Sequence, residues 1–205
     1  MSSPAAAATI LDLYERHAAA WAAARGATLH MEHAWLARFT DGLAAGARVL
    51  DLGCGSAEPI AAHLIAQGFA LQGVDGSAAM IARCRARFPQ HDWLCADMRG
   101  LRLARRFDAI LAWDSFFHLT HADQRAMFAV FAAHAAPGAA LMFTTGPAHG
   151  EAPGTLFGEP LYHASLAPAE YRARLRAHGF AELAHVAEDP ACGGHTVWLA
   201  RHAGA

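Results

Sequence analysis

The chain has 205 residues, a length that suits one compact domain with a buried core. Its 16 basic and 18 acidic residues give a formal net charge of -2, and no cluster of basic residues forms a patch for a nucleic-acid backbone. The sequence has no run of 18 apolar residues and no secretory signal, so we expect a cytoplasmic protein that neither binds nucleic acid nor enters a membrane.

The first 46 residues predict a helical cap. Leu11, Tyr14, Ala18 and Trp21 recur at helical spacing, and Gly26 interrupts the pattern before it resumes. We therefore expect two helices ahead of the first strand.

Short apolar runs then alternate with segments of helical periodicity. The predicted strands cover residues 47–53, 69–76, 91–98, 107–115 and 139–146. The predicted helices cover residues 58–68, 77–89 and 122–138. Because each crossover must return across the sheet with one hand, this order predicts a doubly wound α/β fold with a mostly parallel sheet.

The last third of the chain has a different character. Residues 146–167 carry four glycines and three prolines without periodicity, and so long an irregular segment is typical of a lid or binding loop. A helix over 167–179 follows, and the strands predicted over 180–188 and 194–202 should pair as an antiparallel hairpin. No linker or repeat marks a second domain, so we expect a single domain over residues 1–205.

The stretch "DLGCGSAEP" follows the first predicted strand and opens a helix. Gly53 and Gly55 allow a sharp turn that brings the main chain against a ligand. Asp75 follows Gly55 by 20 residues at the end of the second predicted strand, where a carboxylate can accept the two hydroxyl groups of a ribose. Together these residues predict a ligand that contains adenosine.

Glu58 stands where the dinucleotide-binding motif would place its third glycine. A carboxylate beside a buried pyrophosphate is unfavourable, whereas a cationic ligand such as S-adenosylmethionine tolerates it. Glu58 could equally be an acidic residue that complements the dipole of the following helix. Whether Glu58 contacts the cofactor stays open, but the missing glycine argues against NAD in either case.

Four stretches, "VLDLGCGSAEP", "LQGVDGSAAMIARCR", "WLCADMRGL" and "FDAILAWDSFFHL", resemble the successive motifs of the class I S-adenosylmethionine-dependent methyltransferases. The resemblance covers residues 48 to about 145 well and the rest in outline. It implies a Rossmann-like sheet of seven strands with an antiparallel last strand, S-adenosyl-L-methionine as cofactor and S-adenosyl-L-homocysteine as product. The chain departs from many members at Ala57, where they carry a further glycine.

The resemblance also assigns roles to individual residues. Asp51, Gly53 and Gly55 would hold the methionine part of the cofactor, and Asp75 would hold its ribose. Residues 97–98 would flank the adenine, and residues 113–118 would close over the cofactor. The full set of expected cofactor residues is Tyr14, Trp21, Arg25, Asp51, Gly53, Cys54, Gly55, Asp75, Gly76, Ser77, Met80, Asp97, Met98, Trp113, Asp114, Ser115 and His118.

Two of these expectations also have support from the residues themselves. Asp97 comes just beyond a strand, where a carboxylate can accept a hydrogen bond from the exocyclic amine of adenine. Tyr14, Trp21 and Arg25 lie at helical spacings of seven and four, so one helix face could cover the cofactor. Arg25 would then pair with the cofactor carboxylate.

Ligands of such sheets bind at the carboxyl ends of the strands, so we expect the methyl acceptor there as well. His149 and Tyr162 are the first candidates for the acceptor pocket, because their segment has no evident structural role. Trp113, His163 and His195 are further candidates. The acceptor should be a small molecule; its identity, the atom that is methylated, the use of a general base and the oligomeric state stay open.

We expect no metal in the reaction. Cys54, Cys84, Cys95 and Cys192 are far apart and are expected to be reduced thiols. His149, His163, Cys192 and His195 lie far apart, without the close-spaced pair that is typical of zinc ligands. Magnesium-dependent methyltransferases of the catechol type use acids after the fourth and fifth strands; here "TTG" follows the fifth strand. Two alternatives remain: an NAD(P)-dependent oxidoreductase of Rossmann type, and a non-catalytic module that binds an adenosine ligand.

Overall fold

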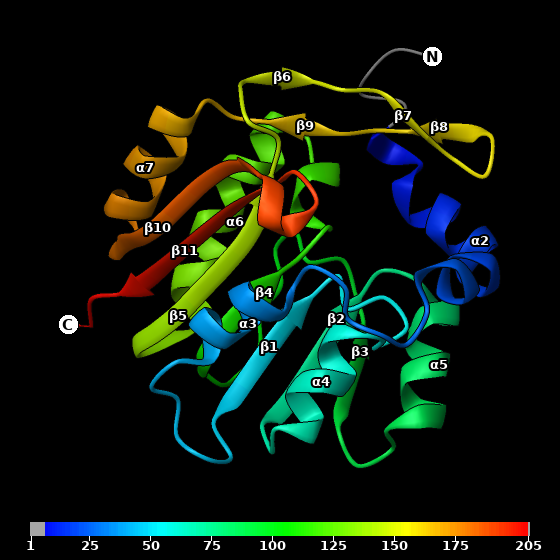
Figure 1. Cartoon of the computed structure of the whole chain (residues 1–205), viewed down its shortest axis with the longest axis horizontal. Helices are drawn as coiled ribbons and strands as arrows, with labels where there is room; N and C mark the ends of the chain where they lie inside the picture. The colour runs from blue at the N-terminus through cyan, green and yellow to red at the C-terminus, as the bar shows by residue number, and fades with distance from the viewer. Residues whose placement is uncertain (1–6, 205) are drawn as a thin grey trace.

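The computed structural model describes residues 7–204, which fold around one central sheet of seven strands (Figure 1). In spatial order, these are β10 (Phe180–Asp189), β11 (His195–His202), β5 (Ala135–Thr145), β4 (Phe107–Ala112), β1 (Arg48–Leu52), β2 (Ala70–Asp75) and β3 (Asp92–Cys95). The helices are α2 (Ile10–Arg25), α3 (His33–Thr40), α4 (Ile60–Ala66), α5 (Ala78–Arg87), α6 (His121–His134) and α7 (Pro168–Ala177), with short 3-10 turns η1 (Phe116–His118) and η2 (Pro190–Cys192).

Strand directions confirm the predicted topology. β1 pairs in parallel with β2 and β4, β2 with β3, and β4 with β5. The last strand, β11, lies between β5 and β10 and is antiparallel to both. The result is a doubly wound, mostly parallel sheet whose carboxyl ends share one edge.

Two apolar layers cover the sheet because successive residues of a strand face opposite sides. In β1, Val49 packs in the layer that contains residues of α3, α4 and α5. Its neighbour Leu50 packs in the layer that contains residues of α6 and α7. No helix within residues 7–204 has both the length and the apolar character needed to cross a membrane.

The junction between α6 and β5 differs from the prediction of a helix up to residue 138. The helix ends at His134 and the strand begins at once with Ala135, which pairs with Phe107. Proline disfavours a helical conformation in the residue before it, so Pro137 fits this earlier start of extended chain.

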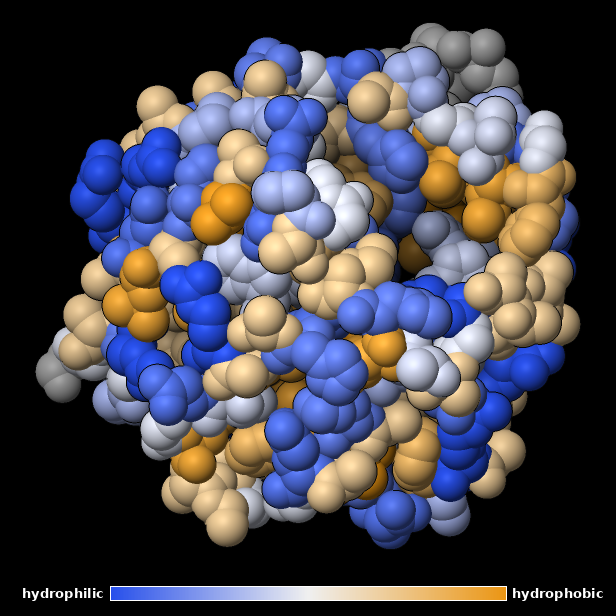
Figure 2. Space-filling model, in the orientation of Figure 1, coloured by the Kyte–Doolittle hydropathy of each residue, from blue (hydrophilic) through white to orange (hydrophobic). Residues whose placement is uncertain are grey.

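The segment 146–167, predicted without regular structure, contains four short strands. β6 (Gly150–Glu151) pairs with β9 (Ala164–Ser165), and β7 (Gly154–Leu156) pairs with β8 (Glu159–Leu161). The β7–β8 hairpin lies beside α2 in Figure 1, and Glu159 forms ion pairs with Arg16 and His17 of that helix. Figure 2 shows a hollow on this side of the molecule, with hydrophobic side chains at its edge.

Candidate functional site

A cavity of about 410 Å³ lies at the carboxyl ends of β1, β2, β3 and β4. Residues of α2 and of the β7–β8 hairpin line it from the other side. All the residues predicted to bind the cofactor line this cavity except Ser77, which caps α5 by accepting a hydrogen bond from the backbone N–H of Met80. Sequence motifs that lie far apart in the chain therefore meet at one hollow, at the sheet edge where ligands of such folds bind.

The turn after β1 requires glycine at position 53. Gly53 has a φ of 78°, in the left-handed region that favours glycine. A Cβ atom there would lie 2.2 Å from the Cβ atom of Ser115. Ser115 is fixed because its hydroxyl donates a 2.6 Å hydrogen bond to the Leu52 carbonyl oxygen. The glycine thus lets the loops after β1 and β4 approach closely at the floor of the cavity.

Asp75 joins two loops at the end of β2. Its Oδ2 atom accepts a 2.9 Å hydrogen bond from the Gly55 N–H, and its Oδ1 atom accepts one of 2.9 Å from the Ser77 N–H. Burial outweighs these bonds and raises the pKa of this carboxyl. Each oxygen keeps a second lone pair, so the carboxylate can still accept hydrogen bonds from a ligand in the cavity.

Asp51 is the most buried acid of the cavity, with 4% of its surface exposed. Its side chain makes no hydrogen bond or ion pair with the described residues, although it lines the cavity. Burial and the nearby charge of Asp75 raise its pKa to about 7. A buried carboxylate is costly without a partner, so this position favours a ligand that supplies positive charge or N–H donors.

Arg25 lines the cavity as predicted, but it already has a partner in the protein. Its guanidinium is hydrogen-bonded through Nη2 to Glu32, which is fully buried and also accepts a 2.9 Å bond from the His30 N–H. This ion pair fixes the position of Arg25. The guanidinium has five N–H donors, so it can hold a ligand carboxylate at the same time.

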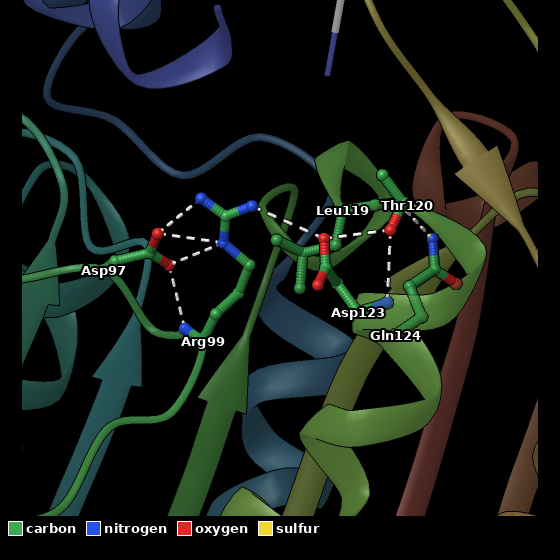
Figure 3. Close-up of polar contacts among 6 residues, drawn as sticks. All are labelled: Asp97, Arg99, Leu119, Thr120, Asp123 and Gln124. Atoms are coloured by element: carbon green, nitrogen blue, oxygen red, sulfur yellow. Dashed lines mark hydrogen bonds and ion pairs between the residues drawn. The ribbon is translucent and has the colours of Figure 1, made fainter. Parts of the chain in front are cut away.

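Arg99 forms several hydrogen bonds with the carboxylate of Asp97 (Figure 3). The Arg99 Nε atom lies 3.0 and 2.8 Å from the two oxygens, and the backbone N–H of Arg99 donates a further 2.9 Å bond. Nη1 also lies 3.4 Å from Asp123 at the start of α6. These bonds lower the pKa of Asp97 against the opposing effect of its burial. Asp97 lines the cavity, yet much of its acceptor capacity is used within the protein.

Glu58 also lines the cavity and forms a 2.8 Å ion pair with Arg87 of α5. It lies ahead of α4, whose first residue is Ile60. Its charge is thus compensated by a side chain as well as by its place near the helix N-terminus. The neighbouring Ala57, which replaces the further glycine of the family motif, has a left-handed φ of 69°.

At the far end of the cavity, the hydrogen bonds fix the proton positions of His118. Its Nδ1 atom lies 2.8 Å from the Tyr162 carbonyl oxygen, which can only accept, so Nδ1 carries a proton. Burial lowers the pKa of His118 to about 4, so the ring is neutral near pH 7. Its Nε2 atom therefore accepts the 2.9 Å hydrogen bond that the Tyr14 hydroxyl donates.

Asp114 and His195 form a pair beside this cluster. His195 Nε2 lies 3.1 Å from Asp114 Oδ2, and its Nδ1 lies 2.7 Å from the Cys192 carbonyl oxygen. The hydrogen bond and charge of Asp114 raise the pKa of His195 against the effect of burial. The ring of His195 stacks on Trp113 with a centroid distance of 5.5 Å. Asp114 has a left-handed φ of 47°, a conformation that is found mainly at constrained sites.

The five acceptor candidates separate into two groups. Trp113, His163 and His195 line the main cavity, whereas His149 and Tyr162 do not. His149 lines a second cavity of about 400 Å³ and stacks on His121. The buried Tyr162 hydroxyl donates a 2.8 Å hydrogen bond to Glu151. Within residues 7–204, no group of three histidine, cysteine or acidic side chains is arranged to hold a metal ion.

Residues 49–138 match the family model of the methyltransferase domain. Over these residues the chain is consistent with a class I S-adenosylmethionine-dependent methyltransferase domain. No curated protein matches the chain in sequence. The match includes the loops after β1, β2, β3 and β4, and it favours methyl transfer over the hydride transfer of the alternative reading.

Solved structures resemble the chain over nearly its whole length. An amino pentose methyltransferase from Micromonospora echinaspora, solved with S-adenosylmethionine, has a TM-score of 0.70 and 24% identity, covering 91% of this chain and 96% of that one. The 1,6-didemethyltoxoflavin N1-methyltransferase of Burkholderia thailandensis has a TM-score of 0.73 and 19% identity, covering 98% and 91%. The magnesium protoporphyrin IX methyltransferase of Synechocystis has a TM-score of 0.72 and 17% identity, covering 96% of each chain. At these identities the likeness establishes the fold.

The sequence analysis did not find two residues of the candidate site, Glu32 and Arg99. Glu32 lies seven residues after Arg25, across a helix break, and no local motif links the two. Arg99 comes two residues after Asp97 and could have been suspected, because an arginine this close to an acid in a tight loop can fold back onto it.

Proposed function

We propose that this protein transfers the methyl group of S-adenosylmethionine to a small-molecule acceptor and releases S-adenosylhomocysteine. The observation that carries this proposal is the pair of carboxylates Asp51 and Asp75 on the floor of the cavity, neither of which has a cationic partner among the described residues. A ligand with a sulfonium and an ammonium group supplies the missing positive charge. A pyrophosphate would add negative charge to the same floor and is disfavoured.

The placement of the cofactor follows from this floor. We propose that its ammonium group lies at Asp51 and its carboxylate at Arg25, which Glu32 holds in position. The ribose hydroxyls then lie at Asp75, whose two oxygens keep free lone pairs. The adenine lies between the loop of Asp97 and the end of β2.

The acceptor is proposed to occupy the part of the cavity that lies beyond the cofactor residues. There the lining includes Leu156 and Leu161 from the β7–β8 hairpin and His163 next to it. These lining residues lie outside the predicted cofactor set, which favours an enzyme over a module that binds only an adenosine ligand. The enclosing hairpin supports a small acceptor, as does the resemblance to enzymes named for a sugar, a toxoflavin precursor and a porphyrin.

In-line methyl transfer needs alignment and exclusion of water. The β7–β8 hairpin and α2 enclose the cavity, so both requirements can be met by the same elements. We further propose that the enzyme acts in the cytoplasm, since the four free cysteines suit a reducing compartment.

Calorimetry with S-adenosylmethionine, S-adenosylhomocysteine and NAD tests the proposal directly. We expect both sulfur compounds to bind and NAD not to bind; the reverse pattern would overturn it. The variant Asp75→Ala should weaken S-adenosylhomocysteine by about 1.5 to 3 kcal/mol, the value of hydrogen bonds to a charged group. An unchanged affinity would remove Asp75 from the site.

A further inference from the structure

Three histidines face the acceptor end of the cavity, and their hydrogen bonds determine which of them can take up a proton. His118 cannot, because Nδ1 donates to the Tyr162 carbonyl oxygen and Nε2 already accepts from the Tyr14 hydroxyl. Both of its nitrogens are therefore occupied within the protein. His118 positions Tyr14 and has no free lone pair for an acceptor.

His195 cannot take up a proton either. Its two nitrogens face a backbone carbonyl oxygen and the carboxylate of Asp114, which are both acceptors. The ring satisfies both only when each nitrogen carries a proton, so His195 is an imidazolium. A cation with both protons already in place cannot serve as a base.

His163 has the opposite arrangement. Its Nδ1 atom lies 3.1 Å from the Ala152 carbonyl oxygen and therefore carries the proton of the neutral ring. Its Nε2 atom has no hydrogen-bond partner among the described residues, so its lone pair is available. The half-buried ring is held between His118, stacked at 4.9 Å, and Phe117, edge-on at 5.0 Å.

The position of His163 in the cavities supports a role in the reaction. His163 and Phe117 are the two residues that line both the main cavity and the second cavity of about 400 Å³. The His163 ring thus borders both the main cavity and additional space that can hold part of an acceptor. His149, the other histidine of this region, lines only the second cavity.

We infer that Nε2 of His163 is the general base of this enzyme, and that its acceptor is a protic nucleophile, an amine or a hydroxyl compound. The inference rests on the proposed methyl transfer. The acceptor lone pair forms the bond to the methyl carbon, and the carbon–sulfur bond breaks with its electron pair passing to sulfur. The proton of the acceptor N–H or O–H moves to Nε2 and then to solvent, so atoms and charge balance.

The surroundings of His163 keep Nε2 unprotonated near neutral pH. Burial lowers the pKa of His163, while the Ala152 carbonyl oxygen and the charge of Asp114 oppose this shift with smaller effects. The stacked His118 is itself neutral. A histidine whose pKa lies somewhat below its ordinary value of about 6.5 is mostly in the basic form at pH 7.

The matched variants His163→Asn and His163→Gln test the inference. Asparagine keeps a donor near the position of Nδ1 and can retain the bond to Ala152, whereas neither variant has a base. With benzylamine and phenol as probe acceptors and S-adenosylhomocysteine release as readout, we expect kcat to fall by about 100-fold or more in both variants. The probe that reacts tells whether the acceptor is an amine or a hydroxyl compound. In the wild type, protonation of the base lowers kcat at acidic pH. This fall in kcat should be absent from both variants.

Two controls keep the inference separate from the proposed function. S-adenosylhomocysteine affinity should be unchanged in His163→Asn; loss of binding in the wild type would instead contradict the cofactor assignment. His178→Asn, at the C-cap residue that follows α7 outside both cavities, should leave kcat and its pH profile unchanged. A His163→Asn variant with the wild-type kcat and pH profile would overturn the assignment of the base.

A second measurement does not depend on the acceptor. In the complex with S-adenosylhomocysteine, nitrogen NMR of labelled histidine should show His163 protonated at Nδ1 and unprotonated at Nε2 at pH 7. Nε2 should take up a proton only as the pH falls below about 6.5. A ring that carries its proton on Nε2 at pH 7 would overturn the inference even if neither probe were methylated.

Discussion

The Nε2 atom of His195 lies 3.1 Å from the Oδ2 atom of Asp114, so the first residue of β11 is tied to the loop that follows β4. This hydrogen bond is the main cause of the raised pKa of His195. A histidine whose pKa is raised on folding stabilises the folded state most at pH values below its unfolded pKa. That contribution is lost as the pH rises through the folded pKa.

His195→Gln should therefore reduce the free energy of unfolding in a pH-dependent way, because glutamine keeps a donor towards Asp114 but no charge. We expect a loss of about 1 kcal/mol below about pH 6.5, since Asp114 is partly exposed, and a smaller loss as the pH rises further. Urea unfolding over this pH range measures it, with His178→Gln as control. A difference that stays constant with pH would show that His195 is not a cation in the folded protein.

Gly53→Ala should destabilise the protein more than the same change at another left-handed glycine. Gly46 has a φ of 75° and open space around its missing Cβ, so Gly46→Ala measures the backbone strain alone, about 1 to 2 kcal/mol. At Gly53 the clash with Ser115 adds to a similar strain. We expect a lower midpoint of thermal unfolding and no S-adenosylhomocysteine binding in Gly53→Ala. Equal destabilisation of the two variants would contradict the close approach.

Local patterns were sufficient to predict the sheet and the floor of the cavity. Gly53, Asp75 and Asp97 each lie at the carboxyl end of a predicted strand, and parallel strands bring these ends to one edge. The location of the site could therefore be predicted from the ends of the strands, without knowledge of side-chain positions. The strand ends did not predict the role of Ser77, which does not line the cavity. Its hydroxyl instead caps α5 by accepting a hydrogen bond from Met80.

The proton positions at the acceptor end could not be predicted from the sequence. His163 and His195 looked alike as candidates, and only their hydrogen-bond partners separate a free base from an imidazolium. Those partners, the carbonyl oxygen of Ala152 and the carboxylate of Asp114, depend on how the 146–167 segment and β11 pack at the sheet edge. Such tertiary contacts leave no spacing pattern in the chain.

Asp51→Asn should have opposite effects on stability and on cofactor binding. The raised pKa of Asp51, about 7, means that the empty protein loses stability as the pH rises from about 4 to about 7. Removing the charge should stabilise the ligand-free protein by on the order of 2 to 4 kcal/mol above pH 7. It should also weaken S-adenosylmethionine binding by about 10- to 100-fold, through loss of a charged hydrogen bond.

Thermal unfolding and calorimetry of the same Asp51→Asn preparation measure the two effects. Asp92→Asn is the control, because Asp92 is exposed and pairs with Arg105 on the surface away from the cavity. A variant that binds S-adenosylmethionine as tightly as the wild type would remove Asp51 from the cofactor site.

Glu159→Gln should accelerate ligand release with little effect on stability. Glu159 ties the β7–β8 hairpin to α2 through Arg16 at 2.5 Å and His17 at 2.6 Å. Exposed ion pairs contribute little to stability because water screens them, so the free energy of unfolding should hardly change. The hairpin and α2 both line the cavity, so loss of the ion pairs between them should raise the dissociation rate constant of S-adenosylhomocysteine by about 3- to 5-fold.

Stopped-flow fluorescence measures the rate, and Glu182→Gln, which breaks an ion pair with Arg172 outside the cavity, is the matched control. Equal dissociation rates for the wild type and both variants would show that the hairpin does not control release, and the exit path would then lie elsewhere along the cavity.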